Sequence, residues 1–282
     1  MADDPALRGW VTQNAAWHPL PGGRTNDLWR VVTSDCALVV KLYRPAQASP
    51  LFPNDPVAEA AALRHLHGRG LAPAFVALVD TQYGTCLIYR HVTGAPGAVA
   101  PADLGRVLAR LHRTTPPAGL RRIPAGSAAI LAQGDRMLAA CTGAGDLLQL
   151  RPAIDLPAAD PVFLHGDPVP ANVIATADGP VLIDWQCPAI GDPLEDLGLA
   201  LSPAMHHLYG MGPLTAAARD ALLAGYANPA VAHRYRAMAP ALHWRMAAYC
   251  HWRLQHRGHT GQDETALRLE VEALKAAAQS SR

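Results

Sequence analysis

Three polar side chains that could together carry out phosphoryl transfer lie in two neighbouring segments. Asp167 and Asn172 occur in the Pro-rich run Phe163–Ile174 (FLHGDPVPANVI), and Asp184 closes the apolar triplet of Val181–Trp185 (VLIDW). A carboxylate can orient an attacking hydroxyl and accept its proton, and hard oxygen ligands can hold Mg²⁺ on phosphate groups. We therefore expect Asp167 to be the catalytic base and Asn172 and Asp184 to bind Mg²⁺.

The order and spacing of these residues separate a catalytic site from a set of ordinary turns. Asp-Pro and Ala-Asn pairs often do no more than form turns, and either pair alone would favour that interpretation. The full pattern, with apolar runs on both sides, instead resembles the H-x-D-x-x-x-x-N catalytic loop of protein kinases followed by a metal-binding Asp. Here Gly166 stands where protein kinases usually have Arg, and we expect His165 to hold the loop in place.

A Lys–Glu pair is predicted to contribute from the N-terminal part of the chain. Alternation along Ala37–Leu42 places Val39 and Lys41 on one face of a strand. Glu59 shares a helix face with Leu63, and a carboxylate on an apolar face needs a partner. Lys41 could be that partner and could then contact the α- and β-phosphates of ATP. The alternatives are a solvated edge lysine and a Glu favoured by the helix dipole.

A glycine-containing segment before the first strand hairpin could approach phosphate oxygens. The sequence Pro21–Asp27 (PGGRTND) contains Gly22, Gly23, Thr25 and Asn26. Small residues allow backbone N–H groups to come close to phosphate oxygens, although such pairs also occur in tight turns. The segment is neither a Walker A loop nor a dinucleotide-binding fingerprint. We expect these four residues to contact the nucleotide.

The elements that must position these residues divide the chain into a strand-rich part and a helical part. This pattern predicts an α+β fold with a cleft between two lobes, in which residues 1–92 bind the nucleotide and residues 93–282 carry the catalytic and acceptor sites. Two short apolar runs flank the catalytic loop and predict a small hairpin, Val162–Leu164 with Val181–Ile183. The other predicted strands are Leu28–Thr33, Ala37–Leu42, Phe75–Asp80 and Thr85–Tyr89, and the predicted helices are Val57–His67, Ala102–His112 and Ala128–Ala140.

Taken together, these motifs resemble the aminoglycoside phosphotransferase and choline kinase superfamily. The most specific parts are His165–Asn172 (HGDPVPAN), Ile183–Trp185 (IDW) and Gly191–Leu197 (GDPLEDL), and the resemblance runs from about Leu20 to Leu201. It implies a bilobal protein-kinase-like fold, ATP and Mg²⁺ as cofactors, and an alcohol as the phosphate acceptor. The Gly-Gly-Arg-Thr-Asn segment is more similar to the choline and thiamine kinase branch than to the antibiotic kinases.

The same resemblance implies further roles. The adenine would meet the backbone around Tyr89 and His91, in the hinge between the lobes. Asp192 and Asp196 match a family motif, and we interpret them as structural because Asp192 precedes a Pro at a plausible helix start. The chain departs from the family in Pro168–Asn172, which puts the shape of the loop in doubt but keeps the metal-binding Asn.

Composition excludes several other classes of protein. Of 282 residues, 50% are hydrophobic and 17% are charged, with a net charge of +1, so no global field favours nucleic acid or a membrane surface. The N-terminus has no signal-peptide pattern, and no apolar run reaches the roughly 20 residues of a membrane span. Five scattered cysteines form no CxxC pair. We expect a cytoplasmic monomer or homodimer.

The acceptor is expected to be a small molecule. Between Asp184 and Asp192 there is room for only a tight turn, whereas a protein kinase needs a longer segment to dock a peptide. Residues 221–262 contain no Asp or Glu but five arginines, so a neutral or anionic acceptor fits this region better than a polycation. A helix over about Leu242–His256 is predicted to form a wall of the acceptor site. Its aromatic residues could hold a quaternary ammonium, whereas its arginines oppose this, and a solvated basic face remains an alternative.

Two other functions remain open at this point. A nucleotide-binding module without catalysis would show a defect among Lys41, Asp167, Asn172 and Asp184, and all four are present. A protein kinase would transfer phosphate to a protein and to no metabolite.

Overall fold

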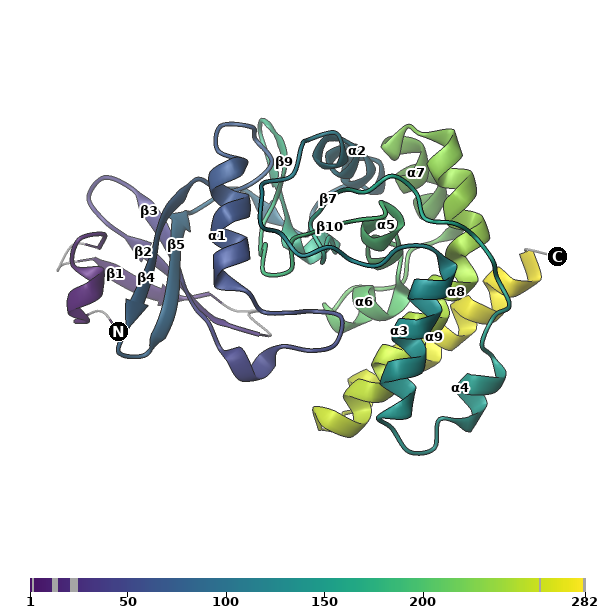
Figure 1. Cartoon of the computed structure of the whole chain (residues 1–282). Helices are drawn as coiled ribbons and strands as arrows, with labels where there is room; N and C mark the ends of the chain where they lie inside the picture. Colours follow the sequence, from purple (N-terminus) through teal and green to yellow (C-terminus); the bar gives the residue numbers. More distant parts are fainter. Residues whose placement is uncertain (2, 12–14, 21–24, 259, 281–282) are drawn as a thin grey trace.

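The N-terminal part of the protein is a twisted antiparallel sheet covered by one helix. The computed structural model describes residues 1, 3–11, 15–20, 25–258 and 260–280. The sheet has the strand order β1-β2-β3-β5-β4, and helix α1 packs beside it (Figure 1). The bounds are β1 Ala16–Pro19, β2 Asp27–Val32, β3 Ala37–Leu42, β4 Phe75–Thr81, β5 Gly84–Arg90 and α1 Pro56–His65.

Local sequence signals account for these elements. Asp55 caps α1 by accepting hydrogen bonds from two backbone N–H groups, and Pro56 occupies the first helical position, where its missing N–H costs nothing. Gly68 and Gly70, both with positive φ, follow the end of the helix. The predicted hairpin between β2 and β3 and the predicted strands β4 and β5 are confirmed.

The two faces of β3 belong to different cores. Leu38, Val40 and Leu42 pack with the N-terminal residues Leu7 and Val11 in a small outer core. On the opposite face, Val39 joins the main core, which continues through α1 into the helical part of the chain. Lys41 lies on that inner face and is almost completely buried. The alternation predicted from the sequence therefore aims the only ionisable side chain of this strand at the other half of the molecule.

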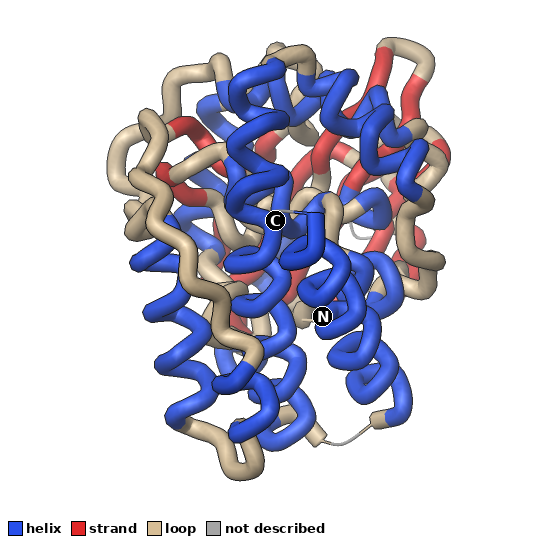
Figure 2. Tube along the Cα trace, turned by 90° about the vertical axis from the view of Figure 1, so that its right-hand side faces the viewer, coloured by secondary structure: helices blue, strands red, loops and turns tan. Residues whose placement is uncertain are grey.

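The C-terminal part is mostly helical, as Figures 1 and 2 show. Within it, α2 packs against α7, and α8 packs against both α3 and α9. The predicted helices at α2 and α3 are confirmed within a residue or two at each end. The helices are α2 Pro101–His112, α3 Ser127–Ala139, α4 Gly145–Gln149, α5 Leu194–Ala200, α6 Pro203–Leu208, α7 Ala216–Tyr226, α8 Pro229–His256 and α9 Gly261–Ser280.

Two small sheets flank the catalytic segment, and here the predicted hairpin is wrong. The two apolar runs do not pair with each other. Strand β7 (Val162–Leu164) pairs with β10 (Ala189–Gly191), whereas β9 (Gly179–Leu182) pairs with β8 (Val173–Thr176), which also pairs with β6 (Ala95–Pro96). The local pattern identified both strands, but pairing depends on partners that the pattern does not specify.

Helix α8 is longer than its predicted range of Leu242–His256. It begins at Pro229, after the N-cap Asn228, and continues through Pro240. A proline inside a helix removes one backbone hydrogen bond. Pro240 and the residues around it are buried, and we infer that their packing offsets the lost bond. None of the described helices is long and apolar enough to cross a lipid bilayer.

The chain thus has a strand-rich part followed by a helical part, as predicted, in an α+β architecture. We propose that the boundary between residues 1–92 and 93–282 lies in the connection from β5 to β6.

Candidate active site

Asp167 lies in a buried turn between β7 and β8, with one carboxylate oxygen already engaged. Its Oδ2 accepts hydrogen bonds from Asn172 Nδ2 (3.1 Å) and from the Tyr209 hydroxyl (2.7 Å). Its Oδ1 is buried and has no hydrogen-bond partner among the described residues. Burial raises the pKa of Asp167 to about 7, against the opposing effect of the Tyr209 hydrogen bond. Since buried polar atoms are normally paired, Oδ1 is the atom that a ligand hydroxyl would satisfy.

The loop that carries Asp167 is held by backbone hydrogen bonds to a carboxylate on α5. Asp196, fully buried, accepts from the backbone N–H groups of His165 and Gly166, both at 2.8 Å. Its Oδ2 also lies 3.0 Å from Nε2 of His112. Asp196 therefore has a structural role, since it fixes the loop that carries Asp167.

His165 and Gly166 complete this support. The imidazole of His165 accepts from the backbone N–H of Asp167 at Nδ1 (3.2 Å) and lies 3.0 Å from the carbonyl oxygen of Ile183 at Nε2. The predicted loop-holding role of His165 agrees with this geometry. Gly166 has φ +86°, and a Cβ there would meet the carbonyl oxygen of Cys187 at 2.1 Å. The Arg of protein kinases could therefore not occupy this position without moving the loop.

Lys41, Glu59 and Asp184 form the second part of the site. Lys41 Nζ donates to Glu59 Oε2 at 2.7 Å and to Asp184 Oδ1 at 2.5 Å. Glu59 also accepts from the Tyr43 hydroxyl and from the backbone N–H of Trp185. Burial disfavours the charged form of Lys41, but the two carboxylates outweigh it and raise its pKa above the usual value. The ammonium thus stays charged and links the N-terminal sheet to the catalytic segment.

Asn172 and Asp184, the predicted metal ligands, come from adjacent turns. The backbone N–H of Ile183 donates to the carbonyl oxygen of Asn172 at 2.9 Å, which aligns the two turns. Asp184 has φ +61°, an uncommon backbone conformation for a residue other than glycine and one often found at functional sites. The Asn172 amide nitrogen donates to Asp167, which leaves its carbonyl oxygen as a potential ligand.

The donor set fits a hard cation that nucleotide phosphates also hold. One carboxylate and one amide oxygen are too few for a cage made of protein alone, and Mg²⁺ usually takes one or two protein ligands together with phosphates. Within the described ranges, no group of three or more His, Cys, Asp or Glu side chains could hold a metal ion.

Thr25 and Asn26, predicted to contact the nucleotide, lie close to the catalytic segment. Asn26 donates from Nδ2 to Gln186 Oε1 at 3.0 Å and accepts from the backbone N–H of Arg44. Thr25 lines the cavity that contains Asp167. Gly22 and Gly23 lie outside the described residues, so their predicted role remains a prediction.

The predicted adenine contacts at Tyr89 and His91 stand at the end of β5. Tyr89 pairs with both β3 and β4, and the His91 N–H donates to the carbonyl oxygen of Ala37. The neighbouring Arg90 N–H is also engaged, since it donates to the carbonyl oxygen of Ala74, just before β4. An adenine at this point would therefore use carbonyl oxygens or the residues after His91, and the two contacts remain predictions.

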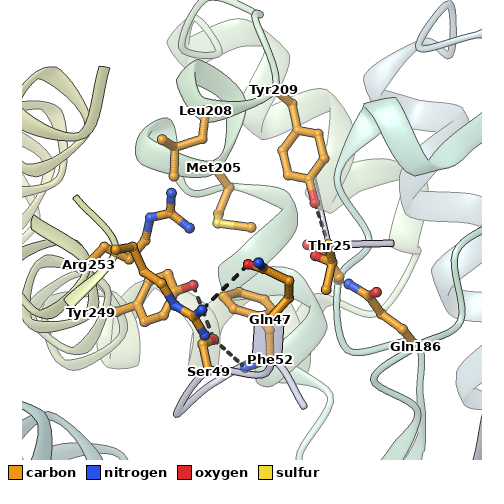
Figure 3. Close-up of a pocket in the computed structure, with 12 residues that line it drawn as sticks. Thr25, Gln47, Ser49, Phe52, Gln186, Met205, Leu208, Tyr209, Tyr249 and Arg253 are labelled. Atoms are coloured by element: carbon orange, nitrogen blue, oxygen red, sulfur yellow. Dashed lines mark hydrogen bonds between the residues drawn. The ribbon is translucent and has the colours of Figure 1, made fainter. Parts of the chain in front are cut away.

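A cavity of about 180 Å³ opens beside Asp167 (Figure 3). It lies between the connection from β3 to α1, the α6 region and the C-terminal end of α8. The sequence did not predict several side chains that line it, since they come from loops and short helices that carry no motif; they are Gln47, Ser49, Phe52, Gln186, Met205 and Tyr209. Tyr249, Arg253 and Arg257 complete its far wall, so the end of α8 borders this cavity, and its role as a wall of the acceptor site remains a prediction.

The predicted aromatic wall is only partly present. Tyr249 lines the cavity, but Trp244 is buried in the core and donates its indole N–H to the carbonyl oxygen of Leu147. Arg245 lies four residues before Tyr249, a spacing that puts the two on one helix face, yet it is buried in an ion pair with Glu195 at 2.7 Å. A basic residue with a buried acidic partner cannot be recognised from helical spacing alone.

The Tyr209 hydrogen bond gives a prediction about pH. Tyr209→Phe is expected to raise the pKa of Asp167, since it removes a donor that stabilises the charged carboxylate. If Asp167 acts as the base, kcat/KM rises with pH as the carboxyl group loses its proton. The pH of half-maximal kcat/KM should therefore increase by about one unit in the variant. Tyr83→Phe, at an exposed turn, should leave the pH profile unchanged; an unchanged profile in Tyr209→Phe would contradict the prediction.

The chain is similar to a known protein family and to several solved structures. Residues 16–240 match the phosphotransferase enzyme family. Similar solved structures include a choline/ethanolamine kinase family protein from Mesorhizobium loti, with 19% identity, a TM-score of 0.68 and coverage of 99% of this chain and 92% of that one. Choline kinase LicA from Streptococcus pneumoniae has 14% identity, a TM-score of 0.67 and 96% coverage of both chains. Spectinomycin phosphotransferase, solved with ADP and spectinomycin, has 14% identity, a TM-score of 0.60 and coverage of 97% and 96%. No curated protein sequence matches the chain.

Proposed function

Because the chain belongs to the phosphotransferase enzyme family, we propose that it transfers the γ-phosphate of ATP to a hydroxyl group of a small molecule in a Mg²⁺-dependent reaction. The observation that carries this proposal is the unpartnered Oδ1 of Asp167 beside a small cavity. A hydroxyl that donates to this atom would be oriented for attack on a phosphate, with the carboxylate placed to accept its proton.

Each residue of the site has a role in this proposal. Asp167 orients the acceptor and takes its proton. Asn172 and Asp184 would hold Mg²⁺, which neutralises charge on the phosphates when bound. Lys41, kept in place by Glu59, contacts the α- and β-phosphates once Asp184 turns to the metal. Lys41 donates to both Glu59 and Asp184, so its ammonium is charged and oriented before a ligand binds, which supports this role.

The compartment, the partners and the oligomeric state of the enzyme are also proposed. We propose a cytoplasmic protein, and its five cysteines, all unpaired in the structure, support a reducing compartment. Its partner is a small alcohol and neither nucleic acid nor a membrane, and the protein acts as a monomer or a homodimer.

A protein substrate is disfavoured by the segment after Asp184. Between this residue and α5 the chain forms β10, which pairs with β7 along Ala189–Gly191. No long segment is therefore available there to dock a peptide. A non-catalytic nucleotide-binding module is disfavoured because Lys41, Asp167, Asn172 and Asp184 are all present and are brought together.

Metal dependence tests the proposal directly. Purified protein incubated with γ-labelled ATP, Mg²⁺ and a small-molecule extract should form a labelled product, and EDTA should prevent it. Asp184→Asn should raise the Mg²⁺ concentration for half-maximal rate at least about tenfold, because one charged ligand is lost. Asp178→Asn, in the exposed turn between β8 and β9, is the matched control. Label transfer that survives EDTA would argue against a metal-dependent reaction.

A further inference from the structure

The cavity beside Asp167 has opposite charges at its two ends. Tyr209, whose hydroxyl donates to Asp167, lies on one side, whereas Arg253 lies on the opposite side, near Tyr249 and Leu208 (Figure 3). Arg257, one helical turn further along the chain, also lines the cavity. Among the described residues that line it, Asp167 is the only carboxylate. The far end therefore carries two arginines against the carboxylate of Asp263, which pairs with Arg253 from outside the cavity lining.

Arg253 is oriented by a contact behind it. Its Nε–H donates to Asp263 Oδ1 at 3.0 Å, and this carboxylate is almost completely buried. The Thr260 hydroxyl donates to Asp263 Oδ2 at 2.6 Å and accepts from the Asp263 backbone N–H at 3.2 Å, so the acid is fixed at the start of α9. A guanidinium whose Nε is bound in this way can present its terminal N–H groups as a planar pair of donors.

Arg257 attaches the N-terminal part of the protein to the same wall. It donates from Nη1 to the carbonyl oxygen of Ala46 (2.8 Å) and from Nη2 to that of Ala48. These carbonyls belong to the connection from β3 to α1, which also supplies Ser49 and Phe52 to the cavity. Arg257 has no carboxylate partner in the described structure, so its positive charge is not neutralised by an ion pair.

The aromatic side chains at this end are already packed against one another. Phe52 meets Tyr249 edge to face at 5.1 Å between ring centres. Tyr249 stacks on Trp252, and Trp252 stacks on His256 at 4.7 Å. A box of free aromatic faces, which a quaternary ammonium needs, is therefore not formed by these residues.

We propose that the acceptor carries an oxyanion, either a carboxylate or a phosphate monoester, which binds Arg253 in the field of Arg257 while its hydroxyl meets Asp167. This inference rests on the proposed phosphotransferase function and adds the charge class of its substrate. In this reaction the acceptor oxygen forms a bond to the γ-phosphorus. The bond between the γ-phosphorus and the oxygen that links it to the β-phosphate breaks, and the hydroxyl proton moves to Asp167. The small volume of the cavity, about 180 Å³, fits an acceptor of a few carbon atoms.

The test separates acceptors by charge. A deproteinised, nucleotide-depleted small-molecule extract is divided by ion exchange into anionic, neutral and cationic fractions, and each is incubated with the protein, Mg²⁺ and γ-labelled ATP. Labelled product should form from the anionic fraction. Prior treatment of that fraction with a phosphatase, then removed, should abolish labelling for a phosphate monoester and preserve it for a carboxylate. Labelling from the neutral or cationic fraction alone would overturn the proposal.

Variants provide an independent readout. With the anionic fraction as acceptor source, Arg253→Gln should raise the apparent KM for acceptor about 10- to 100-fold, as expected for loss of a charge-assisted hydrogen bond, with a smaller change in kcat. Arg236→Gln, an exposed position on the same helix, should leave both constants unchanged. An Arg253→Gln variant with wild-type KM would contradict the proposed contact. Absence of labelling from every fraction would instead count against phosphotransfer itself, which the Asp167 and EDTA experiments assess separately.

Discussion

Replacing Asp167 by Asn is expected to lower kcat by about 10²- to 10⁴-fold, the usual contribution of a positioned general base. The amide is similar in shape to the carboxylate, and its oxygen can still accept from Asn172 and the Tyr209 hydroxyl. The amide nitrogen would then take the place of Oδ1, the atom without a partner. An amide nitrogen cannot accept a proton from an attacking hydroxyl, so the loss should appear in turnover. Label transfer from γ-labelled ATP measures it.

Two controls separate a loss of catalysis from a loss of nucleotide binding or of folding. Binding of Mg·ATP, measured by calorimetry, should remain within about twofold of wild type because Lys41, Asn172 and Asp184 are unchanged. The melting temperature should not fall, since burial of a carboxyl group without a charge partner is costly and the amide avoids that cost. Asp155→Asn, at an exposed loop position, should behave like wild type. If Asp167→Asn keeps turnover within a factor of ten of wild type, Asp167 is not the general base.

The sequence predicted those features that local spacing determines. Asp167 and Asn172 lie in one short loop, and the hairpin of β8 and β9 brings the chain back to Asp184 beside them. Glu59 could be paired with Lys41 because an acid on an apolar helix face requires a partner, and only one basic side chain was suitably placed on the facing strand. The N-terminal hairpins and α1 followed from alternation and capping.

Features that depend on distant contacts were not predictable in this way. Tyr209 follows a short helix and carries no motif, yet it donates to Asp167 across 42 positions of sequence. The connection from β3 to α1, which contains three prolines, resembles an ordinary loop, but Ser49 and Phe52 contact Tyr249 on α8. Strand β7 pairs with β10, and this pairing depends on tertiary packing because several apolar runs have a similar composition. In each case the deciding interaction lies outside the window that a local pattern covers.

The second large effect is expected at Asp196, which touches no substrate in the proposed mechanism. Its two oxygens accept from the backbone N–H groups of His165 and Gly166, and it also lies within hydrogen-bonding distance of His112. Asp196→Ala would leave both N–H groups buried without an acceptor, at a cost of about 1–3 kcal/mol for each. We therefore expect the free energy of unfolding to fall by about 3–5 kcal/mol, measured by urea denaturation.

The same substitution should also reduce catalysis in the protein that remains folded. Asp167 is one residue beyond Gly166, so release of these two hydrogen bonds frees the turn that fixes the carboxylate, and a misplacement of about 1 Å can cost about 10²-fold in rate. Turnover is measured well below the melting temperature, per mole of folded protein. Asp103→Ala removes an exposed ion pair on α2 and should change stability by less than about 1 kcal/mol and turnover not at all. Wild-type turnover in folded Asp196→Ala would show that the catalytic loop keeps its shape without this carboxylate, and the rigidity of the site would then have to come from His165 and the packing of Gly166 against Cys187.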